Sequence, residues 1–176
     1  MAEKQAAGHM TMDEKNAELV ITRTFHAPRE LVFKVWTQAE HLSHWWGPKG
    51  FELNVARLDL RPGGVFHYSM KSADGFEMWG KFVYEEITAP EKIVFVNSFA
   101  DPEGNTICSP FSDIWPLEVR NTLTLTESEG TTTLTLRGGP LRASEEERRA
   151  FVEGFESMKQ GFGGTFDQLE AYLANA

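Results

Sequence analysis

Cysteine is almost absent from this chain, because Cys108 is the only one. A single cysteine cannot form a disulfide within the chain. No apolar run approaches the roughly 18 residues that a membrane-spanning helix needs. The N-terminus also lacks the basic segment followed by an apolar run that marks a signal peptide. Together these absences predict a cytoplasmic protein that does not insert into membranes.

Positive charge is also scarce. The 17 lysines and arginines are outnumbered by 26 aspartates and glutamates, and the formal net charge is −9. No basic stripe runs along any part of the chain. Because nucleic-acid affinity depends on clustered lysine and arginine, this composition argues against a nucleic acid as the partner.

The chain lacks the local signatures of common cofactor and catalytic sites. It has no Gly-x-Ser-x-Gly elbow, phosphate-binding glycine loop or dinucleotide fingerprint. Cys108 has no histidine near it in the sequence to act as a base. His41 and His44 have the helical spacing to reach one metal ion, but a zinc site needs at least a third ligand and none follows at ligand spacing. We therefore expect no cofactor and no metal site, and no residue stands out as catalytic.

What the chain does contain is enough apolar sequence for one domain. Hydrophobic residues make up 41% of the 176 positions and aromatic residues 12%, which suits a single bulky core. Residues 1–16 are polar and without periodicity, and Gly8-His9-Met10 resembles a vector remnant. We expect residues 1–16 to be a leader, partly tag or disordered, and residues 17–176 to form the single domain.

The C-terminal segment has the pattern of a long amphipathic helix. Large apolar residues recur in steps of three or four, at Phe151, Phe155, Met158, Phe162, Phe166, Leu169 and Leu173. Ser144 and Glu147 have the spacing of a capping box that opens the helix. Gly161-Phe162-Gly163-Gly164 interrupts the stripe, although each interior glycine costs about 1 kcal/mol relative to alanine. Such glycines indicate that backbone or ligand approaches the helix closely.

Alternating segments rich in β-branched residues predict an antiparallel sheet before this helix. The first strand is Glu18–Phe25, and a short helix follows from Pro28. Thr37 and Glu40 have the capping-box spacing of a second short helix. Six further strands are expected at residues 51–60, 65–71, 76–87, 93–99, 117–126 and 131–137. The long loop 100–116 is typical of a lid or rim.

Four segments of the chain, taken in order, carry a family resemblance. They are Ile21-Thr22-Arg23-Thr24-Phe25-His26-Ala27-Pro28 with Val32-Phe33 and Trp36; Trp45-Trp46-Gly47-Pro48 with Gly50-Phe51; Asp59-Leu60-Arg61-Pro62-Gly63-Gly64-Val65-Phe66; and Gly161-Phe162 with Phe166, Leu169, Tyr172 and Leu173. Together they resemble the bacterial family named after the activator of heat-shock-protein-90 ATPase, a branch of the START-like or SRPBCC superfamily. The match runs from about residue 18 to residue 174, and the order and spacing of the segments make it specific.

This resemblance implies an α+β helix-grip fold (START-like, Bet v-like). In such a fold a curved antiparallel sheet wraps around the long C-terminal helix, two short helices follow the first strand, and an apolar cavity lies between sheet and helix. The fold does not transfer a function, because superfamily relatives include lipid carriers, polyketide cyclases, hormone receptors and chaperone cofactors. The eukaryotic chaperone activator has a separate N-terminal domain that contributes to chaperone binding. This chain has no room for that domain, so we expect no chaperone partner.

Aromatic residues and methionines are the candidates for the cavity wall, because they are large, adaptable and polarizable. The candidate ligand-binding residues are Trp46, Phe66, Tyr68, Met70, Met78, Phe95, Phe99, Trp115 and Phe162. We place Trp46, Trp115 and Phe162 at the mouth, and the Tyr68 hydroxyl is suited to orient a polar group of the ligand. The alternative is that these side chains simply fill the core. His67 alternates out of phase with its neighbours and is expected to face solvent.

The leading hypothesis is therefore a protein that binds a small hydrophobic molecule between the sheet and the C-terminal helix. The second hypothesis is an enzyme of the cyclase or hydrolase type that uses an acid or base in the cavity, and it rests on superfamily precedent alone. A chaperone-type module that interacts with a protein partner is the third. Open sheet edges and exposed tryptophans are also consistent with a homodimer.

Overall fold

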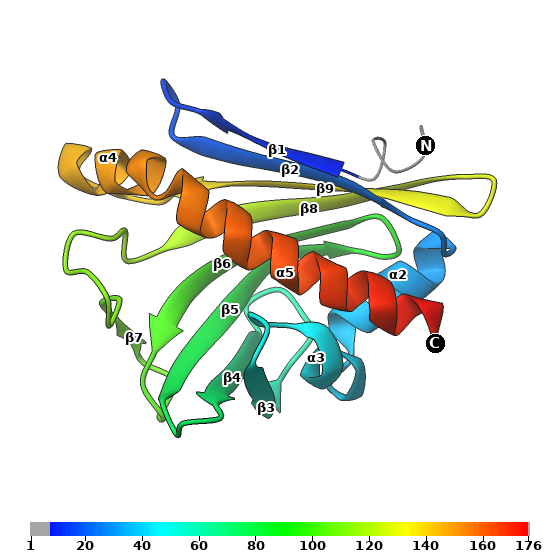
Figure 1. The fold of residues 1–176 in the computed structure, drawn as a ribbon, viewed down its shortest axis with the longest axis horizontal. Coiled ribbons are helices and arrows are strands. Elements are labelled where there is room, and N and C mark those ends of the chain that lie inside the picture. Colours follow the sequence, from blue (N-terminus) through cyan, green and yellow to red (C-terminus); the bar gives the residue numbers. More distant parts are fainter. Residues whose placement is uncertain (1–7, 176) are drawn as a thin grey trace.

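The computed structural model describes residues 8–175, which form one antiparallel sheet and the helices packed on it (Figure 1). The strands are β1 Gly8–Asp13, β2 Glu18–Phe25, β3 Phe51–Leu58, β4 Val65–Ser72, β5 Glu77–Thr88, β6 Lys92–Ala100, β7 Thr106–Ile107, β8 Val119–Ser128 and β9 Thr131–Pro140. They lie in the order β1-β2-β9-β8-β6-β5-β4-β3, and the short β7 pairs with the end of β6. Short turns join β3 to β4, β4 to β5, β5 to β6 and β8 to β9, which makes antiparallel pairing the natural outcome.

The described residues contain helices α2 Arg29–Thr37, α3 Ala39–Trp45, α4 Glu145–Glu153 and α5 Phe155–Ala174. Figure 1 shows α5 crossing one face of the sheet, with α3 below its C-terminal half and α2 behind its C-terminal end. The two short helices follow β2, as expected from the sequence. This is the α+β helix-grip architecture that the sequence predicts.

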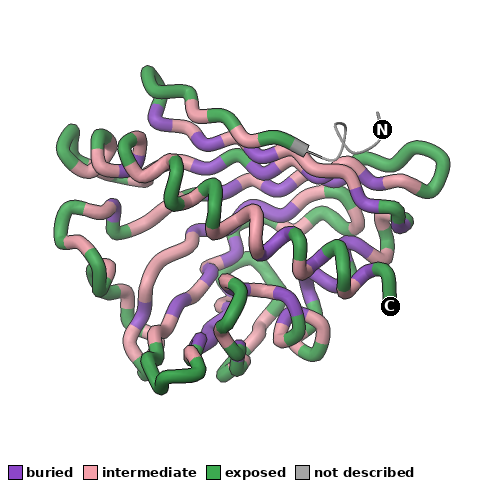
Figure 2. Tube along the Cα trace, in the orientation of Figure 1, coloured by how far each residue is buried: buried purple, intermediate pink, exposed green. Residues whose placement is uncertain are grey.

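The core lies between the inner face of the sheet and the helices. On β8, buried Leu123 and Leu125 alternate with threonines, because successive residues of a strand point to opposite faces. From the other side, Phe166 and Leu169 of α5 reach the same core and are fully buried. Figure 2 shows buried residues alternating along the central strands and recurring on one side of α5.

The N-terminal segment differs from the expectation that residues 1–16 lie outside the domain. Gly8–Asp13 forms β1 and pairs with β2 along its whole length. Met10 and Met12 pack against the core from this strand. An edge strand is held largely by main-chain hydrogen bonds and needs apolar residues on only one face, so a mostly polar segment can still join the sheet. Residues 1–7 lie outside the described residues.

The second short helix lacks the predicted capping box. Thr37 is the last residue of α2, and its hydroxyl donates to the Phe33 carbonyl oxygen at 2.8 Å. Gln38 precedes α3 and provides no side-chain cap. Because Thr37 is buried, this bond within α2 avoids an unpaired buried hydroxyl. The capping box of Ser144 and Glu147, in contrast, is present at the start of α4 as predicted.

The predicted long C-terminal helix is divided in two, and the break falls at Gly154 rather than within 161–164. Gly154 ends α4 and precedes the first residue of α5. A Cβ on Gly154 would lie 2.8 Å from Cζ3 of Trp115, so glycine is needed for the indole to pack there. Residues 161–164 stay helical within α5.

Candidate ligand cavity

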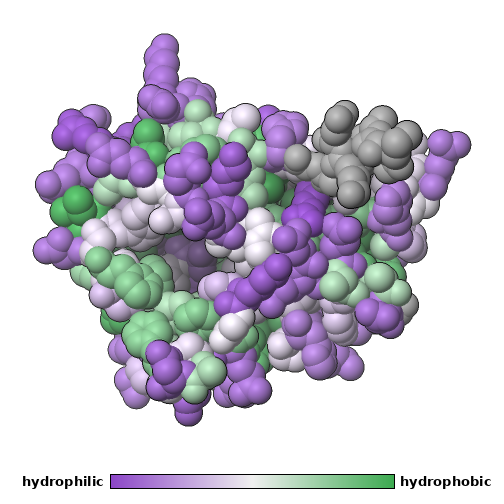
Figure 3. Space-filling model, in the orientation of Figure 1, coloured by the Kyte–Doolittle hydropathy of each residue, from purple (hydrophilic) through white to green (hydrophobic). Residues whose placement is uncertain are grey.

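An apolar cavity of about 220 Å³ lies between α5 and the sheet. Strands β4, β5 and β6 provide one wall and α5 provides the facing wall, while the segments after α3 and before β8 complete the sides. Figure 3 shows its opening as a hollow beside the N-terminal half of α5. The cavity therefore occupies the place that the helix-grip fold predicts.

One face of α5 lines this cavity. Met158, Gly161, Phe162 and Thr165 contribute to the lining, and their spacing brings them to the same side of the helix. A Cβ built on Gly161 would meet no atom of another segment within 4 Å. Glycine at this position therefore leaves free volume in the wall, although it weakens the helix.

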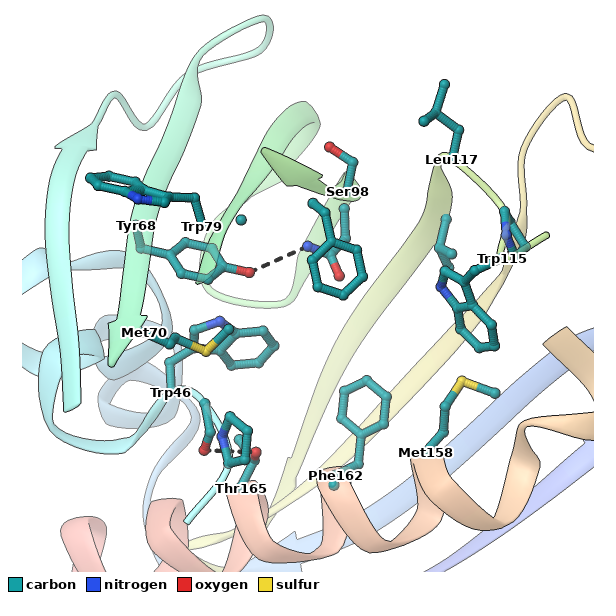
Figure 4. A pocket seen from close by; sticks show the side chains of 18 residues that line it. Trp46, Tyr68, Met70, Trp79, Ser98, Trp115, Leu117, Met158, Phe162 and Thr165 are labelled. Carbon is teal, nitrogen blue, oxygen red and sulfur yellow. Dashed lines mark hydrogen bonds between the residues drawn. The ribbon is translucent and has the colours of Figure 1, made fainter. Parts of the chain in front are cut away.

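The turn that follows α3 is bonded to α5. Gly47 has a φ of +104°, a backbone conformation that residues with side chains rarely adopt. Its carbonyl oxygen accepts hydrogen bonds from Thr165 Oγ1 at 3.0 Å and from Gln168 Nε2 at 2.7 Å. The turn holds the Trp46 ring edge-on to the Tyr68 ring, with 6.4 Å between centroids (Figure 4).

Tyr68 brings a hydroxyl group to the apolar wall. It lies on β4 opposite Gly80 of β5, and Nδ2 of Asn97 on β6 donates to its hydroxyl oxygen at 3.4 Å (Figure 4). The same amide nitrogen donates to the main-chain oxygen of Lys81 at 3.0 Å. Burial raises the pKa of Tyr68, and hydrogen bonds from Trp46 and Asn97 oppose that rise only in part. The hydroxyl therefore keeps its proton at neutral pH.

Trp115 comes from the long loop and borders the cavity near α4. Its ring packs against Phe151 with 5.5 Å between centroids, and it covers Gly154. Leu117, which also lines the cavity, is 45% exposed. This part of the chain thus forms an apolar rim.

No charged side chain lines the cavity in the described part of the chain. The lining residues with polar side chains are Tyr68, Asn97, Ser98 and Thr165, and Trp46, Trp79 and Trp115 carry indole N–H groups. Across residues 8–175 no three side chains of histidine, cysteine, aspartate or glutamate are grouped to hold a metal ion. The chemistry of this lining suits burial of apolar surface with a few hydrogen bonds.

The structure brings most of the predicted site residues together. Trp46, Tyr68, Met70, Phe99, Trp115 and Phe162 all line the cavity. Phe66 and Phe95 instead pack on the ring of Phe82, with centroid distances of 5.1 and 4.1 Å, and are buried in the core. Met78 is partly buried against the core and is not part of the lining. For these three residues core packing is what the structure shows, and ligand binding by the other six stays a prediction.

A search restricted to aromatic residues and strand methionines misses several lining residues. Asn97 alternates with Phe95 and Phe99 along β6, so the strand period already places it on the inner face. Met158 belongs to the same helical stripe as Phe162, and Thr165 lies three residues beyond Phe162. These positions are therefore readable from periodicity, whereas their hydrogen-bond partners are not.

His67 does not face solvent as predicted. It is only 7% exposed, its Nε2 lies 3.0 Å from the main-chain oxygen of Asp101, and its ring packs on Trp79 with 4.9 Å between centroids. The alternation correctly places His67 on the outer face of the sheet. It cannot reveal that the turn after β6 covers that face.

The other chemically reactive side chains lie elsewhere. His41 and His44 both contact Tyr172 of α5: Nδ1 of His41 is 2.6 Å from the hydroxyl oxygen, and the His44 ring stacks with 5.4 Å between centroids. They therefore help to hold α3 against α5. Cys108 is exposed in the long loop.

Comparison with known proteins agrees with this geometry. The family described as Activator of Hsp90 ATPase homolog 1-like protein matches residues 26–174. The chain belongs to this family. Proteins of this kind commonly bind hydrophobic ligands. No curated protein matches the chain, and no helix among residues 8–175 is long and apolar enough to cross a membrane.

Solved structures of bacterial proteins share the fold. Protein Ms6760 from Mycobacterium smegmatis is 25% identical, with a TM-score of 0.78 over 95% of this chain and 97% of that one. A Staphylococcus epidermidis protein is 26% identical, with a TM-score of 0.74 over 94% of each chain. An Arthrobacter aurescens protein is 23% identical, with a TM-score of 0.80 over 96% of this chain and 92% of that one. These likenesses confirm the family fold that the sequence motifs indicate.

Proposed function

We propose that this family member binds a small apolar molecule in the cavity between α5 and strands β4 to β6. The observation that carries the proposal is the free volume at Gly161, a helix position that lines the cavity and where an added Cβ would meet no atom of another segment within 4 Å. Burial of apolar ligand surface in such a place contributes about 25 cal/mol per Å². The neighbouring hydroxyl and amide groups would orient the ligand.

The size of the cavity limits the ligand. An apolar cavity of about 150 Å³ is large enough to hold benzene, and this one measures about 220 Å³. A ligand of one or two rings fits these dimensions better than a long acyl chain does. The rim near Leu117 is the side from which such a molecule would reach the cavity.

Other roles find less support in the lining. Tyr68 is its one titratable side chain within residues 8–175, and no carboxylate or imidazole accompanies it to act as acid or base. The homodimer, the absence of a chaperone partner and the cytoplasmic location remain predictions.

The proposal is tested by filling the cavity. We expect Gly161→Leu to weaken binding of naphthalene by about 10-fold or more, since overpacking a site costs about 1–3 kcal/mol. The same substitution should not destabilise the protein, because leucine favours a helix over glycine by up to about 1 kcal/mol. Tryptophan fluorescence reports the titration, since Trp46 and Trp115 line the cavity.

Gly163→Leu is the matched control. Gly163 lies on the same helix, also has no atom within 4 Å of its Cβ position, and does not line this cavity. It should bind naphthalene as the wild type does. Equal affinities for both variants would contradict the cavity as the binding site. Native mass spectrometry of the freshly purified protein, followed by organic extraction, then identifies the natural occupant.

A further inference from the structure

The hydrogen bonds around Tyr68 determine which groups face the cavity. Nδ2 of Asn97 donates to the main-chain oxygen of Lys81 at 3.0 Å and to the Tyr68 hydroxyl at 3.4 Å. An amide NH₂ has two hydrogens, and these two bonds use both. If the amide were reversed, its oxygen would face the Lys81 main-chain oxygen. Because both oxygens are acceptors, that orientation is unfavourable, and the orientation of the Asn97 amide is determined.

The hydroxyl proton of Tyr68 consequently has no acceptor within residues 8–175. Asn97 donates to the hydroxyl oxygen, and the indole of Trp46 can only donate as well. The residue is 3% exposed, and it lines the cavity. A buried donor without an acceptor is unfavourable, and an acceptor atom inside the cavity is what would satisfy it.

The rest of the lining is neutral. Among its described members are no lysine, arginine, histidine, aspartate or glutamate. Thr165 already donates to the Gly47 carbonyl oxygen. An anionic ligand placed here would lose its hydration without gaining a counter-charge, which is strongly unfavourable.

We propose that the cavity selects neutral apolar molecules that carry one hydrogen-bond acceptor, such as a ketone or ether oxygen, and that the Tyr68 hydroxyl donates to this acceptor. The selection excludes carboxylates of the same shape, including fatty acids. This inference rests on the proposed binding function and adds the chemical class of the ligand.

Three naphthalenes of similar shape test the selection: 2-acetonaphthone, 2-isopropylnaphthalene and 2-naphthoate. With wild-type protein at pH 7 we expect the ketone to bind about 2- to 10-fold more tightly than the hydrocarbon, as one neutral hydrogen bond allows. The carboxylate should bind at least about 10-fold more weakly than the ketone. Titration by tryptophan fluorescence gives the three dissociation constants.

Tyr68→Phe keeps the ring and removes the donor. It should bring the ketone to the affinity of the hydrocarbon while leaving the hydrocarbon unchanged. Tyr84→Phe is the control, because Tyr84 is 2% exposed, does not line the cavity, and has a hydroxyl without a partner among the described residues. Tyr84→Phe should keep the wild-type ratio of ketone affinity to hydrocarbon affinity.

The outcomes separate the two proposals. Binding of the hydrocarbon together with an equally tight carboxylate, or a ketone preference that survives Tyr68→Phe, overturns the inference and leaves the binding function standing. Failure of all three compounds to bind wild-type protein contradicts the binding function and the inference that rests on it. The wild-type comparison of ketone and carboxylate does not depend on the folding of any variant.

Discussion

Tyr68 owes its position to the absence of a side chain on the neighbouring strand. Gly80 faces it directly across β4 and β5. A Cβ on Gly80 would lie 2.7 Å from the tyrosine hydroxyl oxygen and 2.8 Å from Cζ. The ring therefore lies against the backbone of β5, and its hydroxyl meets Asn97 on β6. A single glycine thus determines where the donor of the cavity stands.

Gly80→Ala should lower the free energy of unfolding by about 1–3 kcal/mol, because the ring must move away from an overpacked contact. Urea unfolding measures the change. The control is Gly161→Ala, where the added Cβ meets no atom within 4 Å and helix propensity should raise stability by up to about 1 kcal/mol. Equal stability of Gly80→Ala and wild type would show that Tyr68 is not confined by Gly80.

For individual side chains, the sequence predicts the face of the sheet but not the packing environment. Strand alternation correctly turns Phe66, Tyr68 and Phe95 to the inner face. It does not separate Tyr68, which lines the cavity, from the two phenylalanines, which pack on Phe82 in the core. Both environments are inside the molecule, and a local pattern carries no information on which neighbour fills the adjoining space.

At the level of elements, α5 determines the shape of the segment after α3. Gln168 Nε2 donates to the main-chain oxygens of Gly47 at 2.7 Å and Trp45 at 3.2 Å. Thr165 adds a third bond, to Gly47. These contacts attach the turn that carries Trp46 to the helix opposite the sheet.

Gln168→Met preserves length and removes these donors. We expect the free energy of unfolding to fall by about 1–2 kcal/mol, because the acceptors on the turn lose a partner. Hydrogen exchange at the backbone amides of Trp46 and Gly47 should accelerate. Gln160→Met serves as the comparison, since Gln160 is exposed on the same helix and should change neither quantity. Unchanged exchange in Gln168→Met would mean that α5 does not hold the turn.

The ends of α4 differ in whether neighbouring or distant residues of the chain contact them. The capping box of Ser144 and Glu147 is visible in the sequence because both partners lie within one helical turn. At the break, Gly154 lies against Trp115, which comes from the long loop before β8 and packs where a Cβ would stand. Glycine content alone points to residues 161–164 as the weakest part of the helix, but these residues stay helical within α5.

Over the whole molecule, the space between the sheet and α5 is filled with side chains at one end and left open as a cavity at the other. Trp36, Trp45 and Trp46 pack together with centroid distances of 4.8 to 5.8 Å. Phe166 and Leu169 complete this filled end under the C-terminal half of α5. The N-terminal half of the same helix faces the cavity. The two short helices that follow β2 thus close the sheet on one side only.

Stability should fall at alkaline pH because burial raises the pKa of Tyr68 and of Tyr84 above 10.0, and ionisation of Tyr68 would raise the pKa of Tyr84 further. Below that pH both tyrosines are protonated in the folded and the unfolded chain. Above it the unfolded chain loses these protons while the folded one keeps them. The free energy of unfolding should therefore decrease by up to about 1.4 kcal/mol per pH unit for each tyrosine.

Urea unfolding between pH 8 and about 11 measures this slope in wild type and in Tyr84→Phe. The variant removes one raised pKa, so its stability should depend less steeply on pH. All other residues are the same in both proteins, so the difference between the two slopes isolates the contribution of Tyr84. Identical slopes would contradict a protonated, buried Tyr84.

The sequence by itself determined the kinds of elements, their order and the family, since strand alternation, helix periodicity, turn residues and short motifs act over a few neighbouring positions. It also indicated most of the aromatic residues around the cavity. Only the tertiary structure decided that β1 joins the sheet, that the last helix breaks at Gly154, and that the turn after β6 covers His67. It alone decided that space remains beside Gly161 while Phe82 fills the space beside Phe95. Whether a volume is filled depends on the combined size of side chains from distant segments, and a local sequence pattern contains no information on it.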